Sequence, residues 1–204
     1  MTADFQTLAG EPDPRTPAIP RGDVPYELNL TGFPSEAALA DAVLNRLSTT
    51  FLIHRERRGT HCSGRQVRVD AVIQAHDSTD WKDDDVAFGL EFKLPRRHSG
   101  IKGYTKWIAQ AADYTHVDWD GFGRLPILTC PGPAAWLDRL QQHPPEDPLA
   151  GLARRLTGQL GLGEVQLRWH HGLTITMNGE QLWSERYGVR RGRTWSTKLK
   201  VGSR

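Results

Sequence analysis

The stretch GLEFKLP, residues 89–95, decides how this sequence is interpreted. Its large apolar residues alternate with Glu91 and Lys93, a pattern typical of a β-strand. Successive side chains of a strand point to opposite faces, so Glu91 and Lys93 are expected on the same face. A carboxylate and an ammonium group placed side by side in an apolar strand form either a structural ion pair or part of an active site.

The segments on both sides of this stretch predict a mixed order of helices and strands. Strands are expected at residues 51–58, 66–73, 86–94, 124–130, 164–170, 173–177, 180–188 and 193–201, with a loop at 59–64. Helices are expected at residues 33–50, 101–116, 134–143 and 149–160. In the strand at 66–73, simple alternation puts Val67, Val69 and Ala71 on one face and Arg68, Asp70 and Val72 on the other. This order predicts a mixed α/β fold, in which helices flank one central mixed sheet and the C-terminal end is rich in strands.

Composition and charge place limits on the class of protein. The chain has 204 residues, a net charge of +2 and two cysteines, which favours a reducing, cytoplasmic compartment. No apolar run approaches the length of a membrane span, so no membrane association is expected. No acidic residue follows Glu185, whereas the basic residues there are Arg186, Arg190, Arg191, Arg193, Lys198, Lys200 and Arg204. This basic end suggests a polyanionic partner, and a solvated flexible terminus is the alternative.

The chain divides into three parts by composition. Residues 1–25 are rich in proline and are expected to form an extended arm. Residues 26–145 hold the predicted helix, strands and charged stretch. Residues 146–204 hold a helix and the basic, strand-rich end, which is expected to pack on the same domain.

Asp70 gives the charged pair a chemical interpretation. It lies inside the apolar strand VRVDAVI, which precedes the strand of Glu91 and is expected to pair with it. Two carboxylates brought together repel each other and need a cation between them. Oxygen ligands without cysteine or histidine suit Mg²⁺ or Mn²⁺. With Lys93 beside a bound water, this set suits hydrolysis of a phosphodiester.

Asp70 followed by Glu91-Phe92-Lys93 resembles the sequence pattern of the PD-(D/E)XK nuclease superfamily. The resemblance covers roughly residues 35–130 and implies a restriction-endonuclease-like core of a helix, a three-stranded antiparallel meander, a helix and a further strand. It implies that Asp70, Glu91 and the backbone carbonyl of Phe92 bind the metal and that Lys93 positions the attacking water. Val69 stands where the superfamily's proline would be.

Further positions extend this resemblance. Glu36 corresponds to an acid on the first helix, and its alternative role is to complement that helix's dipole. Gln110 and Tyr114 correspond to the glutamine and tyrosine, four residues apart, that RecB-type members carry after the lysine. The resemblance implies a Mg²⁺- or Mn²⁺-dependent deoxyribonuclease, and a homodimer is compatible with cutting two strands. The candidate DNA-contacting residues are Arg96, Arg97, Lys102, Lys106, Arg190, Arg191, Arg193, Lys198 and Lys200.

Two alternatives stay open at this point. Glu91 and Lys93 can be a cross-strand ion pair on a solvated face, although that leaves Asp70 unexplained. The chain can also be a non-catalytic nucleic-acid-binding protein. A second acid-x-Lys stretch, Asp80-Trp81-Lys82, lies in the acidic run at residues 76–85 and is expected to lack a rigid setting.

Overall fold

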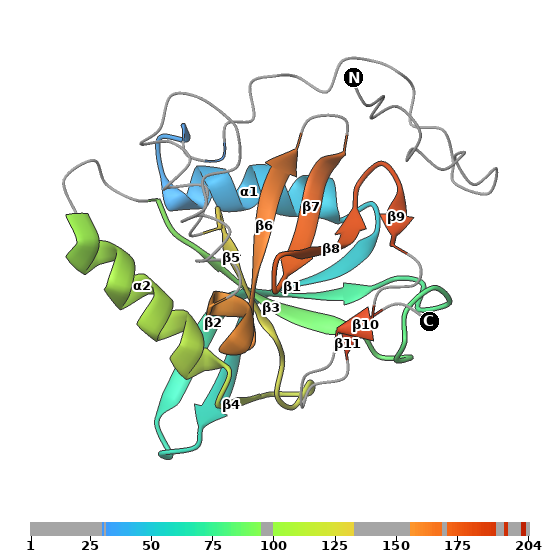
Figure 1. Ribbon diagram of the computed structural model, residues 1–204. Coiled ribbons are helices and arrows are strands. Elements are labelled where there is room, and N and C mark those ends of the chain that lie inside the picture. The colour runs from blue at the N-terminus through green and yellow to red at the C-terminus, as the bar shows by residue number, and fades with distance from the viewer. Residues whose placement is uncertain are drawn as a thin grey trace, which may run out of the picture.

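The fold was analysed in a computed structural model, which describes residues 30, 32–94, 100–132, 156–168, 171–190, 194–195 and 201–202. The predicted arm at 1–25, the predicted helix at 134–143 and most of the basic C-terminal end lie outside these residues. Figure 1 shows a curled sheet with two long helices.

The described elements begin with a helix, three strands and a second helix, and then become strand-rich. The helices are α1 (Glu36–Leu47) and α2 (Gly100–Tyr114). The strands are β1 (Phe51–His61), β2 (Gln66–Ala75), β3 (Ala87–Phe92), β4 (Val117–Trp119), β5 (Ile127–Cys130), β6 (Leu162–Arg168), β7 (Gly172–Met177), β8 (Glu180–Ser184), β9 (Gly188–Val189), β10 (Thr194–Trp195) and β11 (Val201–Gly202).

One mixed sheet contains nine of these strands, in the order β4-β1-β2-β3-β5-β6-β7-β8-β9. Strands β1, β2 and β3 form an antiparallel meander. Strand β5 returns parallel to β3 after α2, and β6 is parallel to β5. The remaining neighbours are antiparallel, and β10 and β11 form a separate pair. Strands β6 to β9 therefore extend the same sheet as the meander.

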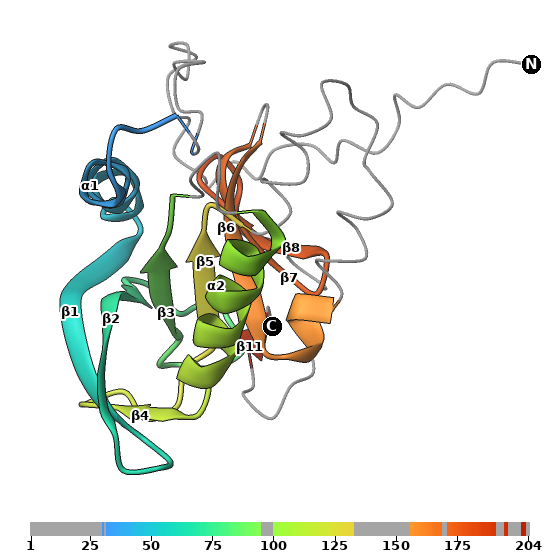
Figure 2. The same ribbon diagram turned by 90° about the vertical axis from the view of Figure 1, so that its left-hand side faces the viewer.

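Each face of the sheet packs against a different helix. Leu39, Val43 and Leu47 of α1 join the larger core, which contains Phe51 and Leu90. Residues of α2 join a second core that contains Val69, Val72, Ala111, Tyr114, Trp119 and Ile127. Figure 2 shows α2 running alongside β5. Because apolar side chains are removed from water on both faces, β3 and β5 are buried along their whole length.

Helix α1 begins where its sequence indicates. The N-cap residue Ser35 has extended backbone dihedrals, and its Oγ accepts a hydrogen bond from the backbone N–H of Ala38 at 3.1 Å. Leu39, Val43 and Leu47 form the predicted buried stripe. The prediction of this helix is confirmed. The cap at Ser35 fixes where the helix begins, and it places Glu36 in the first turn.

The mixed α/β sheet flanked by helices is confirmed, and several local predictions are wrong. Strand β1 runs to His61, over the first three residues of the region expected to be a loop, because it pairs with β2 as far as Thr60 and with β4 from Gly59 to His61. Strand β4 was not predicted, since a three-residue strand is too short to show alternation. The acidic run was expected to be loosely held, yet Trp81 is buried in the larger core.

Candidate functional site

Asp70 and Glu91 lie at the same level of adjacent strands. Strands β2 and β3 pair with Ala71 opposite Leu90, so Asp70 comes next to the level of Glu91 as the strands continue. The carboxylate Oδ2 of Asp70 accepts a hydrogen bond from the backbone N–H of Phe92 at 2.8 Å. This bond fixes one Asp70 oxygen against the strand that carries Glu91 and Lys93.

A backbone irregularity helps to place Asp70. The alternation predicted for β2 is wrong there, because Val69 and Val72 join the core beneath α2 while Ala71 joins the opposite core. Strand β1 shows the same break in alternation. His54 and Arg57 are three residues apart, yet both lie against the ring of Phe122.

Glu56 lies between these two β1 residues, with a φ of 53°. Positive φ is uncommon outside glycine, so Glu56 marks a local departure from regular strand geometry. Near this interruption, Asp70 directs Oδ2 at the backbone N–H of Phe92.

Glu91 is a buried carboxylate, with 3% of its surface exposed. Its Oε1 accepts a hydrogen bond from Gln110 Nε2 at 2.9 Å. Burial and the negative charge of Asp70 raise the pKa of Glu91 from 4.5 to about 7, against the opposing effect of Lys93. One lysine therefore does not offset the cost of ionising Glu91 in this setting.

Lys93 lies between two carboxylates. Its Nζ is 3.6 Å from Glu91 Oε1 and 3.7 Å from Glu36 Oε2. Burial alone would lower the pKa of Lys93, but the charges of Glu91, Glu36 and Asp70 together raise it. Lys93 is therefore held as a cation at the acidic patch, and its side chain is still 35% exposed.

Glu36 does more than complement the dipole of α1. Its Oε1 accepts a hydrogen bond from the backbone N–H of Leu94 at 3.1 Å, while Oε2 faces Lys93. The first turn of α1 is thereby joined to the end of β3. The structure brings Glu36 together with Asp70, Glu91 and Lys93, as the sequence resemblance implies.

Gln110 and Tyr114 approach the acidic patch from α2. The amide Nε2 of Gln110 donates both to Glu91 and to the hydroxyl of Tyr114, the latter at 3.0 Å. Tyr114 packs edge-on against Trp119, and burial raises its pKa. The predicted pair thus lies on one helix face, and Gln110 contacts Glu91 rather than Lys93.

The donor set fits a hard divalent cation. Asp70 and Glu91 supply two carboxylates, and burial together with the charge of Asp70 raises the pKa of Glu91, so a further positive charge there would favour its ionised form. Among the described residues, no three side chains of His, Cys, Asp or Glu are grouped to hold a metal by themselves. Mg²⁺ commonly uses one or two carboxylates and keeps several waters, so two carboxylates suffice for such a site.

The predicted DNA-contacting residues are only partly described. Lys106 and Arg190 are exposed on the surface. The others lie outside the described residues, or, for Lys102, have a side chain outside them. Arg190 follows β9, an edge strand that four strands separate from β3 in the order of the sheet.

One polar cluster beside the site was missed by the sequence analysis. Asp113 of α2 contacts His61 and Arg65 at the turn between β1 and β2. The available signal was an acidic residue in the last turn of a predicted helix, where the helix dipole disfavours negative charge.

Comparison with known proteins adds no family assignment. No protein-family model, no curated protein and no solved structure matches this chain. None of the helices in the described ranges combines the length and apolar character that crossing a membrane requires.

Proposed function

We propose that this protein is a divalent-metal-dependent deoxyribonuclease that hydrolyses DNA phosphodiester bonds. The observation that carries the proposal is the convergence of Asp70, Glu91 and Lys93, with Glu91 buried and its pKa raised to about 7. A structural ion pair needs only Glu91 and Lys93. The second carboxylate, from the neighbouring strand, adds negative charge that a bound cation would neutralise.

In this proposal each residue of the site has a separate role in hydrolysis. Asp70 and Glu91, with the backbone carbonyl of Phe92, would hold Mg²⁺ or Mn²⁺, which when bound supplies positive charge to offset charge developing on the phosphate. Lys93, held near Glu91 and Glu36, donates a hydrogen bond that orients the attacking water. The water oxygen bonds to phosphorus and gives up a proton to solvent, while the bond to the leaving sugar oxygen breaks and that oxygen takes up a proton from solvent. Gln110 keeps the Glu91 carboxylate in place.

The order of elements also supports the proposal. Helix α1, the antiparallel meander β1–β3, helix α2 and the parallel strand β5 come in the order expected for a restriction-endonuclease-like core, with the short strand β4 inserted before β5. The curled sheet continues well beyond that core through β6–β9. A similar order of elements is an argument by analogy, so the acidic patch carries more weight.

The test is DNA cleavage by the purified full chain with Mg²⁺, with Mn²⁺ and with EDTA. Substrates are linear single- and double-stranded DNA, nicked circles, flaps and four-way junctions, which separate exonuclease, endonuclease and resolvase activities. Lys93→Ala is compared with Lys82→Ala, because Lys82 belongs to the other acid-x-Lys stretch and is exposed.

Cleavage that requires the metal, is lost in Lys93→Ala and persists in Lys82→Ala supports the proposal. If all three proteins bind DNA and leave every substrate intact, the protein is a nucleic-acid-binding protein and the proposal is wrong. Equal activity in the two lysine variants would place the catalytic centre elsewhere.

A further inference from the structure

Asp113 occupies a position in α2 that its own helix disfavours. It lies next to Tyr114, the last residue of α2, where unpaired carbonyl groups give the helix end a partial negative charge. No basic residue of α2 occupies that last turn. A carboxylate there needs positive charge from another element.

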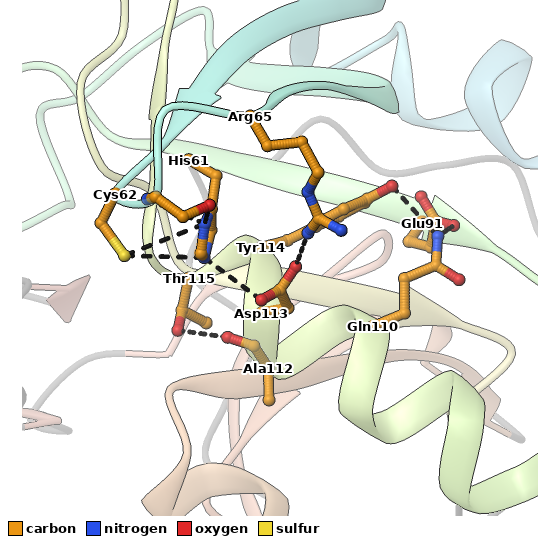
Figure 3. Close-up of polar contacts among 10 residues, drawn as sticks. His61, Cys62, Arg65, Glu91, Gln110, Ala112, Asp113, Tyr114 and Thr115 are labelled. Atoms are coloured by element: carbon orange, nitrogen blue, oxygen red, sulfur yellow. Dashed lines mark hydrogen bonds and ion pairs between the residues drawn. The ribbon is translucent and has the colours of Figure 1, made fainter.

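Arg65, in the turn between β1 and β2, supplies that charge, and His61 at the end of β1 adds a hydrogen-bond donor. The Nε2 of His61 is 3.2 Å from Asp113 Oδ1, and Arg65 pairs with Asp113 Oδ2. Ser63 donates its backbone N–H to Nδ1 of His61 at 3.1 Å, so Nε2 carries the ring proton toward Asp113. Figure 3 shows Asp113 directed at His61 and Arg65, while Gln110 on the same helix is directed at Glu91.

These contacts join the two parts of the molecule that supply the candidate site. The turn leads into β2, which carries Asp70, and α2 carries Gln110 and Tyr114. A second link lies beside the first, because the backbone N–H of Cys62 donates to the carbonyl of His116 at 3.1 Å. The end of α2 is therefore fixed against the hairpin on one side while Gln110 contacts β3 on the other.

The Arg65–Asp113 ion pair itself contributes little to stability. The side chain of Arg65 is 59% exposed and that of Asp113 is 37% exposed, and such exposed pairs are weak. What the contacts of Asp113 with His61 and Arg65 add is a link between the last turn of α2 and the hairpin. A shift of that turn would move Gln110 away from Glu91.

We propose that Asp113 is a positioning residue, held by His61 and Arg65, that sets the end of α2 so that Gln110 and Tyr114 meet Glu91. The effect on cleavage rests on the proposed nuclease function. The effect on the Gln110–Glu91 contact does not, and it can be measured without any substrate.

The test combines a structural and a kinetic measurement on the full chain. The side-chain amide signals of Gln110 are recorded by ¹⁵N NMR and assigned with Gln110→Ala. Asp113→Asn is compared with Asp118→Asn, an exposed aspartate of β4, and with the exchanged pair Asp113→Arg with Arg65→Asp. Thermal unfolding and the kcat and KM of DNA cleavage are measured for each.

In Asp113→Asn we expect the Gln110 amide signals to move toward those of a free side chain and kcat to fall about tenfold with little change in KM. Asp118→Asn leaves the Gln110 signals and kcat at wild-type values. The exchanged pair recovers kcat to within about threefold of the wild-type value.

Unchanged Gln110 signals in Asp113→Asn would overturn the proposal, as would a loss of kcat that simply follows a loss of folded protein. If the Gln110 signals move while even the wild type cleaves no DNA, the positioning role stands and the nuclease proposal fails.

Discussion

Two stretches of this chain share one residue pattern, an acid, an aromatic residue and a lysine. Glu91-Phe92-Lys93 ends β3, and Asp80-Trp81-Lys82 lies in the acidic loop before it. In both stretches the aromatic side chain is almost completely buried in the core that contains α1. The charged residues differ, because Glu91 is buried whereas Asp80 and Lys82 are exposed.

The difference lies in what surrounds each stretch. Strand β3 is central, so Glu91 is covered by α2 and has Asp70 of β2 beside it. In the loop, Asp80 and Lys82 are exposed at the surface, on either side of the buried Trp81. The same three-residue pattern therefore gives a buried carboxylate with a raised pKa in one stretch and exposed charged side chains in the other.

The largest expected effect would separate the two stretches by activity. Glu91→Gln should lower metal-dependent DNA cleavage roughly a thousandfold, because it removes a charged ligand from the proposed cation site. Asp80→Asn should change the rate less than about twofold, since exposed charges away from a site have small effects. The measurement is the rate of DNA cleavage under single-turnover conditions. Comparable losses of rate in both variants would show that the two stretches do not differ in function.

The buried aromatic residues should instead make the two stretches alike. Phe92→Ala and Trp81→Ala should each lower the free energy of unfolding by about 3–5 kcal/mol, because each leaves a cavity in the same core. Urea unfolding measures both changes. A cost below about 1 kcal/mol for Trp81→Ala would mean that the loop is not anchored by this side chain.

The smallest expected effect concerns how the stability of the folded protein depends on pH. The unfolded chain ionises Glu91 near its ordinary pKa of 4.5 and the folded chain near 7, so the folded state binds more protons between these values. Raising the pH through this window therefore destabilises the wild type without metal. Glu91→Gln removes this dependence and should be the more stable protein by up to about 3 kcal/mol above the window, with little difference below it.

Urea unfolding in EDTA at about pH 5 and about pH 8 checks this prediction, with Asp80→Asn as the matched control. Asp80→Asn should show no comparable gain, since Asp80 is exposed. A wild type whose stability relative to Glu91→Gln is the same at both pH values would show that Glu91 ionises normally.

Local sequence was sufficient for the long elements. The cap at Ser35 and the apolar stripe of α1 predict that helix, because they depend on neighbours within a few residues. The same holds for the central strands and for the shared helix face of Gln110 and Tyr114. It failed for β4 and for the end of β1, since both depend on pairing between distant segments.

The sequence by itself therefore determined the order of the long elements and the residue types that can meet at the end of β3. Only the tertiary structure decided which groups contact each other. The contact of Glu36 with Lys93 and the contact of Asp113 with the hairpin both join residues far apart along the chain. Such contacts depend on burial and on charges from several elements at once, and no local spacing encodes them.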